Sequence, residues 1–248
     1  MRCLVIIEKL LQPICIGKYR DERPVINENN EPLIQVWPIQ NRLFIQSSYY
    51  ERNVPHSLKS LYLREQTVKQ LLIALSYLPQ NYSFILYDGF RPLEIQRYLF
   101  EEMALAIQKA NPAFSAEQVQ QETLKYVAYP SIDEGYPAPH LTGGAIDLTL
   151  GDEYGKPLDM GTDFDEASAK SATDYYEKYP DENSIALINR RLLFHSMTNA
   201  GFQNYEEEWW HYDFGNVTWA RKTNATHANY GPIIAQIEGH ELKEYRFK

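Results

Sequence analysis

The sequence predicts an α+β fold in a single domain, with a small, mostly antiparallel sheet flanked by helices. The chain has 248 residues, of which 44% are hydrophobic and 13% aromatic, enough to bury a core without disulfide support. Helical and strand-like segments come in separate groups instead of in strict alternation, which favours α+β over α/β. No internal repeat, low-complexity tract or Gly/Ser-rich linker divides the chain, so residues 1–248 are expected to form one domain.

The first 55 residues are rich in Pro, Asn and short apolar runs, such as Leu-Ile-Gln-Val-Trp at 33–37. They predict short strands and arms that wrap a core and that would roof a cleft. At the N-terminus, Glu8 and Lys9 interrupt an apolar stretch that is shorter than the roughly 7–15 residues of a signal-peptide core. We interpret it as an arm or strand and expect a cytoplasmic protein, whereas a functional signal would make it periplasmic.

Apolar residues at helical spacing predict the helices, and proline, glycine or capping residues bound them. Residues 115–118 form a capping box, Pro92 suits a first helical turn, and Gly201 suits a helix end. The predicted helices are 58–78, Pro92 to Asn111, Ser115 to about Val127, and 184–200.

Short apolar or aromatic runs between turn residues predict the core strands. These strands are 83–87, 145–150 and 209–214. Pro130, Pro137 and Pro139 impose a long non-helical loop, which presents His140.

Charge and cysteine content exclude several classes of protein. There are 24 basic and 33 acidic residues, a net charge of −9, which argues against nucleic acid as a partner. The longest uncharged stretch, 70–87, is interrupted at Pro79, whereas a membrane span needs about 20 mostly apolar residues. The two cysteines, Cys3 and Cys15, are compatible with one bridge or with two reduced thiols.

Two segments carry residues suited to metal chemistry. His140 precedes two glycines and a strand that carries Asp147 among apolar neighbours; a buried carboxylate must be paired, hydrogen-bonded or metal-bound. Glu208 and His211 lie within an aromatic run. In a regular strand, positions i and i+3 face opposite sides, so a shared site requires a bulge or a strong twist.

Together, His140, Asp147 and His211 form a ligand set that catalytic zinc uses, with one position left for water. Zinc lowers the pKa of such a water toward roughly 7, and Glu208 would act as its general base. Arg91 lies where a predicted strand ends and a helix begins. It is interpreted either as a structural cation, paired with Asp88 or exposed, or as a group that stabilises an oxyanion.

With these residues in place, the chain resembles the zinc D-alanyl-D-alanine dipeptidases of the VanX type. The family pattern is Ser-x-His-x-x-Gly-x-Ala-x-Asp, followed by Glu-x-x-His. The residues in register here are His140, Gly143, Ala145, Asp147, Glu208 and His211. The Tyr-Asp-Gly-Phe-Arg-Pro stretch at 87–92 and the segment 160–165 also agree. The resemblance covers about 83–214, which would be the metal-site core of a single catalytic domain.

The resemblance implies a fold like that of the zinc D,D-carboxypeptidases and hedgehog-type domains, with one Zn²⁺ per chain. It implies His140, Asp147 and His211 as zinc ligands, Glu208 as the base and Arg91 as the residue that steadies the tetrahedral intermediate. Within the matching segment 160–165, Asp165 is the candidate for the substrate ammonium, because a site that selects dipeptides must recognise both charged ends. A solvated loop acid is the other interpretation of Asp165.

The expected reaction is hydrolysis of D-Ala-D-Ala or similar small dipeptides, in which metal-bound water attacks the peptide carbonyl. One alternative is a zinc D,D- or L,D-carboxypeptidase that acts on peptidoglycan stem peptides. Another is a zinc-containing module that binds peptide or cell-wall fragments without turnover. One departure from the family pattern is Ala138, which replaces its Ser and bears on substrate preference and catalytic efficiency but not on metal binding.

Overall fold

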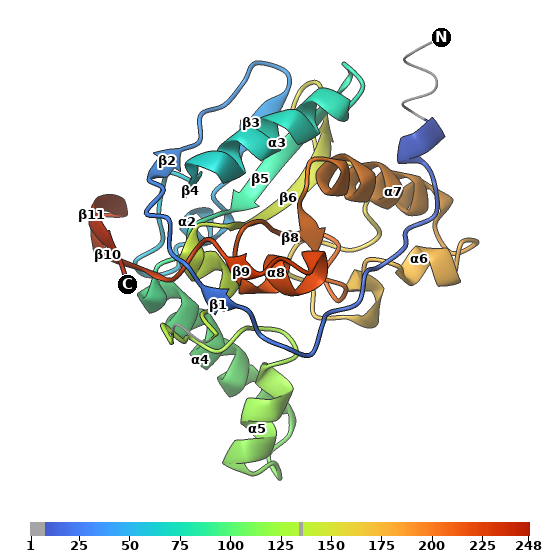
Figure 1. Cartoon of the computed structure of the whole chain (residues 1–248). Coiled ribbons are helices and arrows are strands. Elements are labelled where there is room, and N and C mark those ends of the chain that lie inside the picture. Colours follow the sequence, from blue (N-terminus) through green and yellow to red (C-terminus); the bar gives the residue numbers. More distant parts are fainter. Residues whose placement is uncertain (1–7, 134–135) are drawn as a thin grey trace.

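The computed structural model describes residues 8–133 and 136–248 and shows an α+β architecture around one central sheet (Figure 1). The sheet has five strands in the order β3 (Leu43–Ile45), β5 (Tyr82–Asp88), β6 (Ala145–Asp152), β8 (His211–Asp213) and β7 (Gln203–Asn204). Only the β3–β5 pair is parallel, so this sheet is mostly antiparallel, as predicted. The prediction for residues 1–7, and with it Cys3, lies outside the described residues.

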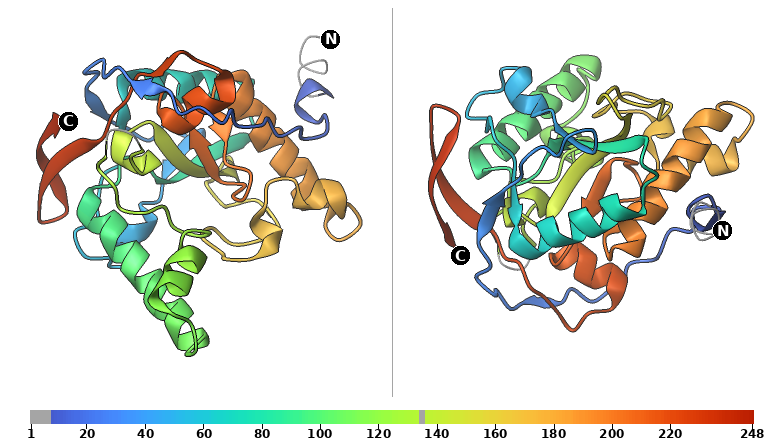
Figure 2. Two further views of the ribbon diagram at one scale, coloured as in Figure 1. Left: turned by 60° about the horizontal axis from the view of Figure 1, so that its bottom comes forward. Right: turned by 90° about the horizontal axis from the view of Figure 1, so that it is seen from above.

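Helices α3 (Glu65–Tyr77) and α7 (Ser184–Asn199) cover one face of the sheet, while α4 (Leu93–Ala110) lies on the other side (Figure 2). Side chains alternate between the two faces of a strand. In β6, Ile146 and Leu148 therefore join the core beneath α3 and α7, and Tyr212 of β8 joins the same core. Asp147, between Ile146 and Leu148, points to the opposite face. So do the two residues that flank Tyr212 in β8, His211 and Asp213.

The chain before β5 contains several short elements; those within the first 55 residues match the predicted short pieces, whereas β4 lies where a helix was predicted. These pieces are β1 (Val25–Ile26), β2 (Leu33–Gln35), α2 (Ser48–Glu51) and β4 (Tyr62–Arg64), together with β3. β1 pairs in parallel with β9 (His227–Ala228), so an early segment and a late segment of the chain are joined. β2 pairs with β4 in an antiparallel ladder.

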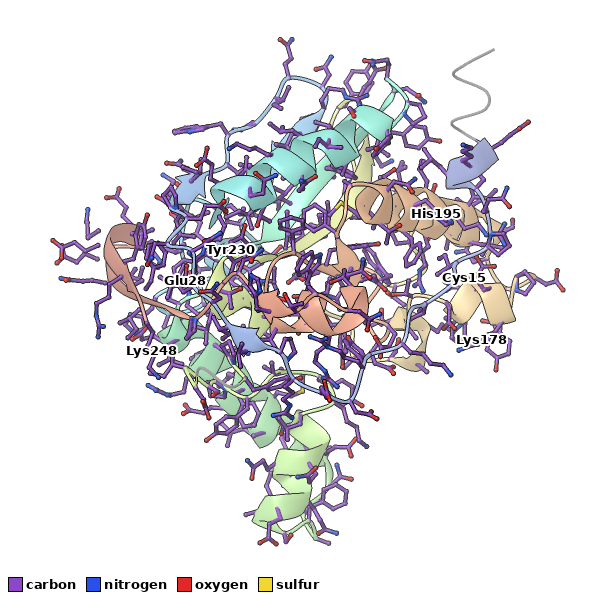
Figure 3. The ribbon with its side chains drawn as sticks, in the orientation of Figure 1. Cys15, Glu28, Lys178, His195, Tyr230 and Lys248 are labelled. Atoms are coloured by element: carbon purple, nitrogen blue, oxygen red, sulfur yellow. The ribbon has the colours of Figure 1, made fainter. Side chains whose placement is uncertain are left out.

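Arg64 fastens several of these pieces together. Its side chain is fully buried, and its two Nη atoms donate to the carboxylate of Glu28, each at 2.9 Å. Its Nε donates to the carbonyl of Thr142 at 2.7 Å. Glu28 also accepts from the backbone N–H of Gly231, next to Tyr230, and Figure 3 shows Glu28 and Tyr230 close together. The N-terminal segment, β4, the loop of His140 and the C-terminal region thus meet at one ion pair.

The remaining elements lie around the sheet. They are α5 (Ala116–Thr123), η1 (Pro139–Thr142), η2 (Ala169–Ser171), α6 (Tyr175–Lys178), α8 (Val217–Thr223), β10 (Ile233–Glu238) and β11 (Glu241–Phe247). β10 and β11 form an antiparallel hairpin that the sequence analysis did not predict. Within the described part of the chain, no helix is long and apolar enough for a membrane span.

Three predicted elements have wrong boundaries. The helix predicted from residue 58 begins at Glu65, because 62–64 form a strand that pairs with β2. The helix predicted to reach about Val127 ends at Thr123, although its capping box is present as predicted. The strand predicted over 209–214 is confined to 211–213, because Glu208 to Trp210 form a turn in which the Trp209 N–H donates to the Ser171 carbonyl.

Candidate metal centre

Two of the three predicted ligands lie opposite each other on neighbouring strands. Asp147 of β6 pairs in register with His211 of β8. Both are buried, at 2% and 6% exposure, and both point away from the face that α3 and α7 cover. The alternation of apolar and polar residues along the two strands therefore delivers a carboxylate and an imidazole to one point.

The third ligand, His140, comes from η1 at the end of the proline-rich loop. Gly143 ends this short helix with a φ of 70°, a conformation that favours glycine. At Gly144, a Cβ atom would lie within 2.3 Å of the Phe214 carbonyl oxygen, so only glycine lets the loop approach β8 this closely. The Nδ1 of His140 lies 2.8 Å from the Gly89 carbonyl, to which it donates. The lone pair of Nε2 is therefore left facing Asp147 and His211.

The donor atoms of these three residues converge. His140 Nε2 lies 3.1 Å from His211 Nδ1 and 3.3 Å from Asp147 Oδ2, while His211 Nδ1 lies 3.0 Å from Asp147 Oδ1. Zinc with ligands about 2.0–2.1 Å away at tetrahedral angles would separate them by about 3.3–3.4 Å. Among the described residues, this is the one group of three or more His, Cys, Asp or Glu side chains arranged to hold a metal ion. The spacing and the donor set fit zinc.

The charged groups at this point change the pKa values of Asp147 and His211. Burial alone would raise the pKa of Asp147, but His140 and His211 beside it hold that pKa well below its usual value. Burial alone would lower the pKa of His211, but Asp213 and Asp147 raise it well above its usual value. In the metal-free protein, an imidazolium therefore lies beside a carboxylate, and a divalent cation at this point would replace the proton.

Asp213 is a site residue that the sequence analysis missed. Its Oδ2 lies 3.3 Å from His211 Nε2, and its Oδ1 accepts a hydrogen bond from Asn216 at 2.5 Å. Ligating histidines usually give their second ring N–H to a carboxylate or carbonyl, which fixes the ring and its tautomer. The Gly89 carbonyl plays this part for His140, and Asp213 is the carboxylate in ion-pair contact with the second ring nitrogen of His211. The available signal was the spacing: residues two apart on a strand share a face.

Arg91 lies next to the ligands and is held rigidly. It is 7% exposed, and its Nε donates to Asp88 at 2.7 Å. Its Nη1 donates to Gln96 Oε1 at 2.9 Å, and its Nη2 lies 3.1 Å from the Tyr49 hydroxyl and 3.4 Å from Asp147 Oδ2. The pairing with Asp88 and the position beside the ligands therefore occur together, although the sequence presented them as alternatives.

Glu208 lies in the turn before β8 and not in the strand itself. Glu208 and His211 are therefore not held on opposite faces of one regular strand. Its carbonyl accepts from the N–H of His211 at 3.4 Å and from Asn204 Nδ2 at 3.0 Å. The side chain keeps partial exposure toward a pocket but is otherwise enclosed by protein. Burial, with Asp147 and Asp165 in support and His211 and Arg91 in opposition, raises the pKa of Glu208 to about 8.

Asp165 has the left-handed φ of 67° and forms an ion pair with Arg52, whose Nη1 lies 2.9 Å from Asp165 Oδ2. Both side chains are partly exposed, at 37% for Asp165 and 55% for Arg52. Asp165 is thus neither a free carboxylate nor an isolated surface acid, because Arg52 accompanies it at the edge of the site.

One pocket of about 780 Å³ joins all of these groups. It is lined by every predicted site residue: Arg91, His140, Asp147, Asp165, Glu208 and His211. Tyr19, Tyr49 and Arg52 contribute to its wall from the first 55 residues. Ala138, which replaces the Ser of the family pattern, is also in the wall and is 3% exposed.

Comparisons with known proteins show which family the chain is similar to. The D-alanyl-D-alanine dipeptidase of Synechocystis sp. is 28% identical over 198 residues, which are 74% of this chain and 79% of that protein. The D-alanyl-D-alanine dipeptidase of Escherichia coli is 33% identical over 129 residues, 52% of this chain and 53% of that protein.

Among solved structures, the vancomycin resistance D,D-pentapeptidase VanY, a mutant in complex with Zn(II), is 14% identical, with a TM-score of 0.44 over 84% of this chain and 89% of that one. The model of the D-Ala-D-Ala dipeptidase family matches residues 52–230, a span that contains all six predicted site residues and most of the chain. The chain therefore belongs to the D-Ala-D-Ala dipeptidase family of peptidases.

Proposed function

We propose that this protein is a zinc-dependent dipeptidase that hydrolyses D-Ala-D-Ala or similar small dipeptides in the cytoplasm. The observation that carries the proposal is the convergence of His140 Nε2, His211 Nδ1 and the Asp147 carboxylate on a pocket that Glu208 and Arg91 also line. The names of the relatives support the same substrate.

His140, Asp147 and His211 would hold the zinc ion. When bound, zinc supplies Lewis acidity, which makes water nucleophilic at neutral pH and polarises a carbonyl group. The protein orients the two imidazole rings through the ring nitrogens that do not face the metal. The Gly89 carbonyl contacts His140 Nδ1, and the Asp213 carboxylate contacts His211 Nε2.

Glu208 would move the proton in this reaction. Its carboxylate takes a proton from the attacking water and later gives it to the leaving amine. The enclosed position of Glu208 raises its proton affinity, which suits a group that must accept and release a proton near neutral pH. A neighbouring cation lowers this affinity and keeps the carboxylate ready to act as a base.

Arg91 would stabilise the negative charge that develops on the carbonyl oxygen. Asp88, Gln96 and Tyr49 fix its guanidinium before substrate arrives, so little reorganisation is needed as the charge forms. Asp165 would receive the ammonium of the dipeptide, with Arg52 beside it as a competing partner.

The test uses the purified chain, its measured zinc content, and hydrolysis of D-Ala-D-Ala beside a pentapeptide that ends in D-Ala-D-Ala. We expect one zinc per chain and cleavage of the free dipeptide. Cleavage of the pentapeptide alone would refute the dipeptidase and favour the carboxypeptidase. Binding without cleavage of either would favour the binding module.

Glu208→Gln is expected to keep its zinc and to lose about 10²–10⁴-fold or more in kcat. Unchanged activity would remove Glu208 from the mechanism. The proposed location is tested separately, by fractionation of cells that produce the protein.

A further inference from the structure

The pocket extends well beyond the metal centre. It continues from His140 along α4 and the segment that follows α5, residues 124–131. Its volume of about 780 Å³ lies in the range of pockets that enclose drug-sized ligands, about 300–1,000 Å³. The two methyl side chains of D-Ala-D-Ala leave this extension unfilled.

The extension is apolar, and we call it the apolar arm. Leu99, Met103 and Ala106 line it from α4, at spacings that place them on one side of a helix. The segment that follows α5 also contributes to the wall, with Leu124, Tyr126, Val127 and Tyr129. Leu124 and Tyr126 each keep 38% exposure and Tyr129 keeps 52%. Apolar surface left open in a concavity beside a catalytic centre is typical of a ligand-binding wall.

Gln96 ties the apolar arm to the metal centre. Its side chain is 1% exposed, and its Oε1 accepts from Arg91 Nη1 at 2.9 Å while its Nε2 donates to the Ala128 carbonyl at 2.7 Å. The wall segment is therefore positioned by the same residue that orients Arg91. Phe100 adds an edge-on contact with the Tyr129 ring, at 5.4 Å between centroids.

The chemistry of the apolar arm selects its occupant. Glu102 and Lys125 are its charged residues, and Lys125 is already paired with Glu122 at 2.6 Å. A stem peptide would place further carboxylates and amines against a wall of hydrocarbon and phenol rings whose one lysine is already paired. A bulky apolar or aromatic side chain would instead bury surface there.

We propose that the preferred substrates are dipeptides with one bulky apolar or aromatic side chain, which occupies the apolar arm while the peptide bond lies at the metal centre. This inference rests on the proposed dipeptidase function and narrows its substrate class. A hydrophobic pocket discriminates by about 10–200-fold per methylene group. A phenyl ring in the apolar arm should therefore raise kcat/KM at least about tenfold over a methyl group.

The test compares kcat/KM of the zinc-loaded protein for D-Ala-D-Ala, D-Ala-D-Phe, D-Phe-D-Ala and a pentapeptide that ends in D-Ala-D-Ala. We expect one of the two phenylalanine dipeptides to exceed D-Ala-D-Ala by at least about tenfold. Cleavage of D-Ala-D-Ala with both phenylalanine dipeptides slower would overturn this inference and leave the dipeptidase standing. A preference for the pentapeptide, or no cleavage of any substrate, would overturn both.

Two variants locate the effect in the apolar arm. Ala106→Trp fills the arm from an exposed helical position, so the ratio of kcat/KM for the preferred phenylalanine dipeptide to that for D-Ala-D-Ala should fall to about one. The matched control is Leu105→Trp on the preceding residue of α4, which is 65% exposed and lies outside the arm. It should keep the native ratio. An unchanged ratio in Ala106→Trp, or an equal fall in both variants, would contradict the assignment.

Discussion

Replacing Glu208 with glutamine is expected to stabilise the metal-free protein at alkaline pH, in addition to its effect on activity. Glutamine keeps the shape of a protonated glutamate but cannot ionise. The enclosed carboxyl of Glu208, with its pKa raised to about 8, resists ionisation in the folded chain. A variant without the ionisable group therefore avoids the free-energy cost of ionising an enclosed carboxyl group in the folded protein.

The sign and size of the effect follow from proton linkage. In the unfolded chain this carboxyl ionises near pH 4.5 and in the folded chain near pH 8. Below pH 4.5 Glu208 is protonated in both the folded and the unfolded state, so its titration does not change the free energy of unfolding. Between these values only the unfolded state loses the proton, so stability falls as pH rises, and above 8 the loss is constant. The upper limit is about 5 kcal/mol, because a tenfold change in proton affinity is worth about 1.4 kcal/mol. Water that reaches Glu208 through the pocket reduces this, and we expect about 1–3 kcal/mol.

The assay is urea denaturation of the chelator-treated protein at pH 5 and pH 8.5. From pH 5 to pH 8.5, the free energy of unfolding of Glu208→Gln should rise by about 1–3 kcal/mol relative to that of the native chain. Glu207→Gln, at the exposed neighbouring carboxyl, is the control and should show no such gain. Saturating zinc should narrow the gap, because a nearby cation favours the carboxylate. A difference between the native chain and Glu208→Gln that is equal at both pH values would refute the reasoning.

Three further predictions concern the residues around the metal centre. Asp213→Asn should weaken zinc binding by about 10–100-fold, measured by competition with a chelator, because His211 loses the carboxylate behind its second nitrogen; native affinity would contradict this role. Arg91→Lys should lower kcat by about 10²–10³-fold while zinc content is unchanged, and a purely structural Arg91 would instead lower stability alone. Titration calorimetry at pH 7 in buffers of different ionisation enthalpy should detect about one proton released per zinc, since the raised pKa of His211 keeps it protonated; no release would contradict the imidazolium.

The sequence predicted the parts of the site that depend on local pattern. The apolar residues around Asp147 placed it on a buried strand, and the prolines and glycines around His140 predicted a loop that turns tightly toward that strand. The residue types suggested the ligand set only loosely, and the resemblance made it specific, because no local pattern states that residues 64 positions apart face each other across two strands.

Long-range contacts account for what the sequence did not predict. The strand at 62–64 forms only because β2 lies beside it, so helical periodicity extended the helix too far toward the N-terminus. The partners of Arg91 come from α2 and α4 as well as from the strand before it. The turn at Glu208 depends on contacts with Ser171 and Asn204, which are remote from any pattern in the aromatic run.

The three donors differ in how firmly the backbone holds them, and this has a kinetic consequence. Asp147 and His211 belong to a hydrogen-bonded ladder in the middle of the sheet, whereas His140 sits on a single 3₁₀ turn, fastened through Thr142 to Arg64. Local opening of that turn would detach His140 and leave the metal bound by Asp147 and His211 alone. The rate of metal exchange should therefore match the rate of amide hydrogen exchange in residues 140–144 and be much faster than global unfolding. The contact with Arg64 should determine the half-life of the bound metal.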